Sequence, residues 1–161
     1  MRRALALAPM NTPQPSSGNL FLVVGYDGSP PSSRALDAAV RLLQGRSGRI
    51  DVVYVAHLTT VEMMSADAIA EMEVSFDEIE RDLRASASKQ LEGREDRWRF
   101  DRGQGTITDQ LLATAARLHE EHPDDTVSIV VGSSSQAAHR LVGSVAVSLA
   151  RRSPVPVVIV P

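Results

Sequence analysis

The sequence predicts an open parallel α/β sheet of five strands with helices on both faces. Short apolar runs alternate along the chain with segments whose apolar residues recur every three or four positions. Parallel strands need crossover connections, and an alternation of strands and helices supplies them. At 161 residues, 43% of them hydrophobic, the chain is long enough for one such domain and too short for two ordinary ones.

The first two strands are predicted on either side of a helix. Leu20 to Tyr26 reads LFLVVGY, a continuous apolar run typical of a strand buried on both faces of a parallel sheet. The turn-forming residues 27–31, DGSPP, end it. Ser32 or Ser33 is then expected to cap an amphipathic helix. Ile50 to Ala56, IDVVYVA, forms the second strand.

The second half of the chain continues the same alternation. Apolar residues between Ala66 and Leu91 step by three or four, which predicts a long helix with one charged, solvated face. The remaining predicted elements are an edge strand at Arg97 to Phe100, a helix at Thr106 to Glu120, a strand at Val127 to Val131, a short helix opening at Gly143-Ser144, and a last strand at Val155 to Val160.

The ends of the chain divide into two predicted parts. The first residues carry two arginines before an apolar patch that is too short for a secretion signal. Residues 11–19, NTPQPSSGN, have the composition of a flexible segment. We therefore expect residues 1–19 to be a flexible leader and residues 20–161 to be the folded domain.

The segment from Ser128 to Val160 is the most informative for function. It contains a strand, a polar loop that begins at Gly132, and a helix that begins at Gly143-Ser144. Unpaired backbone N–H groups and the positive end of the helix dipole meet at such a helix start, and a glycine without a Cβ lets an anion approach them. The pattern predicts a site for a phosphate group, although a glycine hinge with a helix cap would look the same.

Composition and missing motifs exclude several other functions. The net charge of −3 gives little electrostatic support for nucleic-acid binding, and without cysteine there are no disulfides or thiolate zinc sites. No apolar stretch approaches the roughly 20 residues of a membrane-spanning helix. The sequence lacks the GxxxxGK[ST], HExxH and GxSxG motifs of P-loop nucleotidases, zinc proteases and serine hydrolases.

Several segments in this order resemble the universal stress protein family. They are VVGYDGSPPSSRAL, DVVYVAH, GQGTITDQLL and the ending VVGSSSQAAHRLVGSVAVSLARRSPVPVVIVP. The resemblance covers almost everything from Leu20 to Pro161. The resemblance implies a five-stranded parallel sheet of order 3-2-1-4-5 with helices on both faces. The first and fourth strands would then be neighbours, and Asp27 would face Gly132 across a crevice at their carboxyl ends.

Members of this family that bind ATP carry a glycine, two residues, a second glycine, nine residues, and then glycine with serine or threonine. This chain is similar, with Gly132 at the first glycine and Gly143-Ser144 at the last. It departs from the pattern at Ser135, which stands in place of the second glycine, and the loop is two residues shorter.

The resemblance also implies a set of nucleotide-binding residues. Asp27 would accept hydrogen bonds from the ribose hydroxyls, and Ala56 would occupy the apolar adenine-pocket position. Arg140 is added on chemical grounds, because it could supply positive charge to a triphosphate. The full predicted set is Gly25, Tyr26, Asp27, Ala56, Val131, Gly132, Ser133, Arg140, Gly143, Ser144 and Val145.

Three functions remain open from the sequence. In the first, the protein binds ATP, with or without Mg²⁺, and the ligand biases the conformation that an unidentified protein partner recognises. In the second, the same fold is a nucleotide-free dimeric interaction module. The third is an enzyme that hydrolyses ATP, but no residue pattern clearly positions a water or a metal, so any turnover would be slow. The first two describe a cytoplasmic protein that is not an enzyme. A homodimer is expected through the last strand, Val155 to Val160, because an apolar edge strand needs cover. The flanking prolines could also protect that edge.

Overall fold

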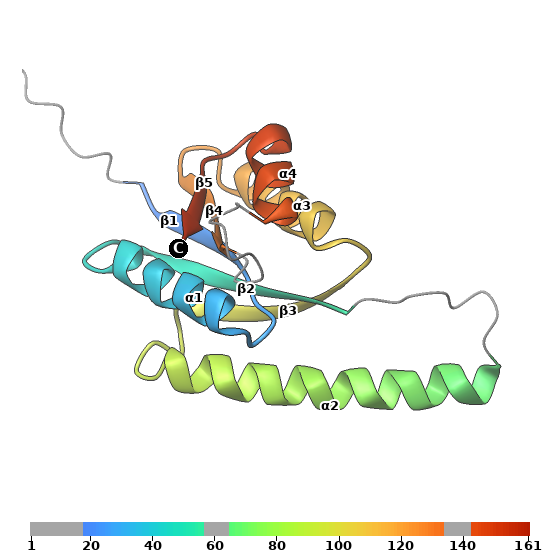
Figure 1. The fold of residues 1–161 in the computed structure, drawn as a ribbon. Helices are drawn as coiled ribbons and strands as arrows, with labels where there is room; N and C mark the ends of the chain where they lie inside the picture. The colour runs from blue at the N-terminus through green and yellow to red at the C-terminus, as the bar shows by residue number, and fades with distance from the viewer. Residues whose placement is uncertain (1–17, 57–64, 134–142) are drawn as a thin grey trace, which may run out of the picture.

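The five strands form one parallel sheet in the order β3-β2-β1-β4-β5, as predicted (Figure 1). The computed structural model describes residues 18–56, 65–133 and 143–161, so the expected leader lies almost entirely outside the described residues. The strands are β1 (Leu20–Gly25), β2 (Gly48–Ala56), β3 (Trp98–Gln104), β4 (Thr126–Gly132) and β5 (Val157–Val160). The helices are α1 (Pro30–Leu43), α2 (Ala66–Gln90), α3 (Ile107–Glu121) and α4 (Ser144–Arg152).

Helices cover both faces of this sheet. α1 and α2 lie on one face, and α3 and α4 lie on the other (Figure 1). Successive side chains of a strand point to opposite faces, so Leu22 and Val24 pack toward α1 while Phe21 and Val23 pack toward α3. β1 is buried on both faces, which explains its continuous apolar sequence. None of the helices in the described ranges is long and apolar enough to cross a membrane.

The position of β1 determines where a ligand can bind. β1 pairs with β2 on one side and with β4 on the other, in parallel register throughout. The connections that follow β1 and β4 therefore leave the sheet in opposite directions. In open α/β sheets this reversal leaves a crevice beyond the carboxyl ends of the two strands, and that crevice is where ligands bind.

The start of α1 differs from the sequence prediction. The residue that caps the helix is Ser29 rather than Ser32 or Ser33, and its hydroxyl accepts a hydrogen bond from the backbone N–H of Ser32 at 3.4 Å. Pro30 occupies the first helical position, where the missing N–H costs nothing because that group has no partner inside the helix. The two prolines begin the helix instead of delaying it.

Strand boundaries also differ from the prediction, and for β3 and β5 the reason is clear. β3 runs on to Gln104 because it stays in register with β2 as far as Ala56, despite its charged sequence. β5 begins at Val157 rather than Val155. Pro156 has no N–H to donate to a strand ladder, but its carbonyl still accepts from the N–H of Ile129 at 2.9 Å.

Candidate functional site

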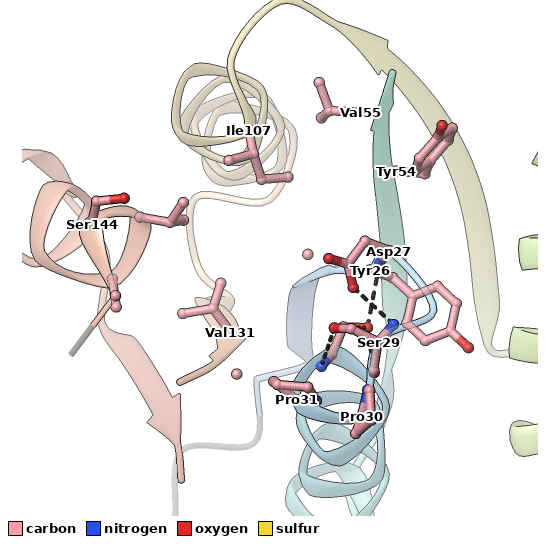
Figure 2. Close-up of a pocket in the computed structure, with 16 residues that line it drawn as sticks. Tyr26, Asp27, Ser29, Pro30, Pro31, Tyr54, Val55, Ile107, Val131 and Ser144 are labelled. Atoms are coloured by element: carbon pink, nitrogen blue, oxygen red, sulfur yellow. Dashed lines mark hydrogen bonds between the residues drawn. The ribbon is translucent and has the colours of Figure 1, made fainter. Parts of the chain in front are cut away.

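A cavity of about 490 Å³ opens at the carboxyl ends of β1 and β4. Its size is within the usual range for small-molecule sites, roughly 300–1,000 Å³. Figure 2 shows Asp27 on one side and Ser144 on the other, with Ile107 and Val131 between them. The described lining residues are Gly25, Tyr26, Asp27, Ser29, Pro30, Pro31, Ser32, Tyr54, Val55, Ile107, Val131, Gly132, Gly143, Ser144, Val145 and Ala146.

Asp27 is held in place by the turn between β1 and α1. The backbone N–H of Ser29 donates to its Oδ1 at 3.0 Å, and its own N–H donates to the hydroxyl of Ser32 at 3.3 Å (Figure 2). Burial raises the pKa of Asp27, but hydrogen bonds from Ser29, Ser32 and its own backbone together lower the pKa below the ordinary 3.8. The side chain is therefore an oriented carboxylate at neutral pH.

This lowered pKa predicts a specific pH dependence of stability. A carboxylate whose pKa is lower in the folded state stabilises the fold above its unfolded pKa, and this contribution is lost as the pH falls through the folded value. We therefore expect wild type to be more stable than Asp27→Asn at pH 7, and the difference to shrink below the ordinary pKa of 3.8. Urea unfolding of both proteins at pH 7 and pH 3 measures the difference. An unchanged difference at pH 3 would contradict it.

Gly132 forms a close contact between the end of β4 and the start of α1. A Cβ at this position would overlap the carbonyl group of Pro31 and lie 2.8 Å from the Cβ of Pro31. These atoms are backbone or proline ring atoms, which cannot move aside like the end of a flexible side chain. Only glycine lets the two segments approach this closely, and both of them line the cavity.

The start of α4 provides the polar end of the cavity. Gly143 is the capping residue, and no side chain in the described part of the chain makes a hydrogen bond to cap this helix. Backbone N–H groups of the first turn are thus available to an anion, next to the hydroxyl of Ser144.

In the described ranges, no group of three or more His, Asp or Glu side chains is placed to hold a metal ion.

The structure brings most of the predicted site residues together. Eight of them line the cavity, namely Gly25, Tyr26, Asp27, Val131, Gly132, Gly143, Ser144 and Val145. Ala56 and Ser133 are not lining residues; Ala56 is 1% exposed and packs into the core on the α1 and α2 face. Arg140 lies outside the described residues.

Sequence reasoning missed one wall of the cavity and several other residues that line it. The wall is the first turn of α1, and the rest comes from the end of β2, the start of α3 and one further residue of α4. The local signal for the α1 wall was the segment Ser29-Pro30-Pro31, which follows Asp27-Gly28 and was interpreted as part of a turn. The missed lining residues are Ser29, Pro30, Pro31, Ser32, Tyr54, Val55, Ile107 and Ala146.

Comparison with known proteins identifies the family. The model of the universal stress protein family matches residues 22–161, which include every strand of the sheet apart from the start of β1. The chain belongs to this family. No curated protein sequence matches this universal stress protein family member.

Solved universal stress proteins share its fold. UspA from Lactobacillus plantarum has a TM-score of 0.69 and 17% identity, with 89% of this chain and 99% of that chain covered. A universal stress protein in complex with cAMP has a TM-score of 0.60 and 26% identity, with 88% and 97% covered. A family protein from Arabidopsis thaliana with AMP bound has a TM-score of 0.56 and 11% identity, with 88% and 90% covered.

Proposed function

We propose that the protein binds an adenine nucleotide, ATP, in the cavity between β1 and β4, and that the bound nucleotide biases a surface used by a protein partner. One observation carries the proposal: an oriented carboxylate, Asp27, lies across a cavity of about 490 Å³ from the open start of α4. Structures of two family members, with cAMP and with AMP bound, support the choice of an adenine nucleotide.

Each end of the cavity suits a different part of a nucleotide. Asp27 can accept hydrogen bonds from both ribose hydroxyls. The apolar side chains of Val55, Ile107 and Val131 offer a surface for the adenine ring. The first-turn N–H groups of α4 and the hydroxyl of Ser144 can donate to phosphate oxygens. Arg140, as a further phosphate contact, remains a prediction from the sequence.

Magnesium would enter this site together with the nucleotide. Asp27 is the one charged side chain among the described residues that line the cavity. Mg²⁺ prefers six oxygen ligands and usually combines a few carboxylates with phosphate oxygens and water. The triphosphate would therefore supply its main ligands. We propose that the protein acts through binding and that any ATP hydrolysis is slow. Rapid turnover needs a base and a group that positions water, and the one charged side chain among the described lining residues, Asp27, is assigned to the ribose.

Titration calorimetry with the full chain tests the nucleotide site. ATP, ADP, AMP, cAMP and adenosine are each titrated into the protein with Mg²⁺ present, and GTP serves as the base-specific control. We expect the adenine compounds to bind more tightly than GTP. The proposal fails if no adenine compound binds at millimolar concentration, and a nucleotide-free interaction module would then be the better account.

We place this function in the cytoplasm, which suits a chain without cysteine.

We also propose that the protein is a homodimer joined through β5. This strand is at the edge of the sheet, and its four residues are half-buried rather than buried. The carbonyls of Pro156 and Val160 accept from the N–H groups of Ile129 in β4 and Ser133 just after it. The alternation along a parallel strand therefore places the N–H and C=O groups of Val157 and Ile159 at the open edge. Exposed groups of this kind pair readily with a second strand.

Two substitutions of Ile159 test whether the dimer depends on backbone pairing at the β5 edge or on side-chain contacts. Ile159→Pro removes an N–H that faces the open edge and leaves the carbonyls that accept from β4 in place. Ile159→Ala is the control, because it shortens the same side chain and keeps the N–H. By sedimentation at tens of micromolar, we expect wild type and Ile159→Ala to be dimers and Ile159→Pro to shift toward monomer. A monomeric wild type would contradict the proposal.

A further inference from the structure

α2 has a stripe of apolar residues that continues beyond the part of the domain against which the helix packs. Its members are spaced alternately by three and four residues, as in a heptad repeat. They are Ile69, Met72, Phe76, Ile79 and Leu83. In Figure 1 the N-terminal half of α2 extends away from the sheet, while its C-terminal half lies against α1 and β2.

The members of this stripe have different surroundings. Phe76 and Leu83 pack against the core beneath α1 and α2. Ile69, Met72 and Ile79 belong to neither core cluster of the described residues. Ile69 and Met72 are half-buried, and Ile79 is 44% exposed. Phe76 and Leu83 therefore anchor the helix to the domain, while the other three members keep part of their apolar surface open.

Tertiary contacts hold this helix at a fixed angle. The hydroxyls of Tyr26 and Ser86 are 3.0 Å apart, and Gln90 Nε2 donates to the carbonyl of Ser33 at 2.7 Å. Nearer the middle of the helix, Arg102 forms ion pairs with Asp77 at 2.5 Å and with Glu80 at 3.3 Å. The C-terminal half of α2 is thus attached to the domain, and the N-terminal half projects from it.

The projecting half is strongly acidic. The segment from Ala66 to Asp82 contains seven Asp or Glu residues and a single basic residue, Arg81. Arg102 pairs with two of the seven, Asp77 and Glu80. If Ile69 and Phe76 are a positions of a heptad and Met72 is a d position, Glu73 falls at e and Asp82 at g, on opposite sides of the stripe. In a pair of packed helices, the e and g positions select the partner by charge.

We propose that the partly exposed members of the α2 stripe, Ile69, Met72 and Ile79, dock a basic amphipathic helix of a partner protein. The apolar stripe provides the contact, and its acidic edges favour lysine or arginine at the corresponding positions of the partner. A second copy of α2 is disfavoured, because it would bring two acidic segments together. A membrane surface with anionic lipids would be repelled for the same reason. This assignment does not depend on nucleotide binding in the cavity.

A synthetic peptide provides a direct probe. It has three heptads with leucine at a and d, lysine at e and g, neutral residues elsewhere, and a fluorescent label. A second peptide of identical composition has its leucines scrambled so that they form no stripe. Fluorescence anisotropy with the full chain is expected to show binding of the first peptide at least about tenfold tighter than the second, and salt should weaken it.

Three variants place the binding on the stripe. Ile69→Ser with Met72→Ser is expected to weaken peptide binding by about tenfold or more, since two apolar contacts are lost. Glu73→Gln with Asp82→Asn should weaken it at low salt and have a smaller effect at high salt. Val74→Ser is the matched control, because Val74 is 59% exposed and projects from the opposite side of the helix. Circular dichroism verifies that α2 stays helical in each variant.

Several results would overturn the proposal. These are no peptide binding by wild type at about 100 μM, equal binding of the two peptides, or an equal loss in Val74→Ser. Sedimentation adds another test. If the Ile69→Ser, Met72→Ser variant changes from dimer to monomer while Ile159→Pro remains a dimer, the stripe binds a second copy of the chain and the assignment to a basic helix is wrong.

Discussion

Replacing Gly132 with alanine is expected to lower the free energy of unfolding by about 1–3 kcal/mol, the usual cost of forcing an extra carbon into a packed site. The added Cβ would overlap the carbonyl group of Pro31 and lie 2.8 Å from its Cβ. The end of β4 and the first turn of α1 would have to move apart. Because both segments line the cavity, nucleotide affinity should also fall by at least about tenfold.

Gly25→Ala is the matched control for this variant. Gly25 also lines the cavity, but its added Cβ would meet only side chains, the nearest being Leu111 Cδ1 at 3.2 Å. Leu111 can shift by a few tenths of an ångström, whereas the Pro31 backbone is part of a helix start. Urea unfolding and calorimetry with ATP give both quantities for each variant. Equal effects of the two substitutions would show that the contact with Pro31 is unimportant.

Replacing Asp27 with alanine is expected to weaken adenosine and ATP binding alike, by about 10- to 100-fold. This range corresponds to the loss of charged hydrogen bonds worth roughly 1.5–3 kcal/mol. The loss should be similar for both ligands because Asp27 faces the ribose in the proposed pose, and the two ligands share the ribose. A loss confined to ATP would instead place the carboxylate near the phosphates.

A second aspartate distinguishes a local effect from a general effect of charge. Asp96 is exposed and precedes β3, at the opposite end of the sheet from the cavity. Asp96→Ala changes the net charge by the same amount and should leave both affinities unchanged. Calorimetry with adenosine and with ATP measures the two variants under the same conditions. Equal weakening by both substitutions would mean that Asp27 acts only through the net charge of the protein.

The general architecture was predictable because the relevant patterns are local. The buried runs LFLVVG in β1 and TVSIVVG in β4 are too short for helices, and the segments between strands have helical periodicity. These patterns indicate parallel strands joined by helices. The strand order came from the resemblance to the universal stress protein family, and the structure confirms it. Local patterns alone do not specify which strands become neighbours.

The boundaries that were wrong depend on properties that periodicity does not capture. Ser29 caps α1 because the prolines after it fit the first turn of a helix, although the same residues also favour turns. β3 extends to Gln104 because pairing with β2 outweighs its polar sequence. Here tertiary pairing overrides local preference.

The site was predictable where residues directly follow a strand, and not where a wall comes from elsewhere. Asp27 and Gly132 were found because parallel strands end at the same edge of the sheet. Ala56 was assigned to the cavity although its side chain points into the core below α1 and α2; the preceding residue, Val55, lines the cavity. The approach of Pro31 to Gly132 joins residues about a hundred positions apart, and no local pattern encodes it.

The separation of the two cavity walls along the chain has a consequence during synthesis. β1 and the turn with Asp27 leave the ribosome before the rest of the domain, but the opposite wall requires β4 and α4, which are close to the end of the domain. The cavity cannot form until almost the whole domain has been made. Any ligand of this cavity binds only the completed domain, and it will stabilise that domain by mass action against partly made and misfolded chains.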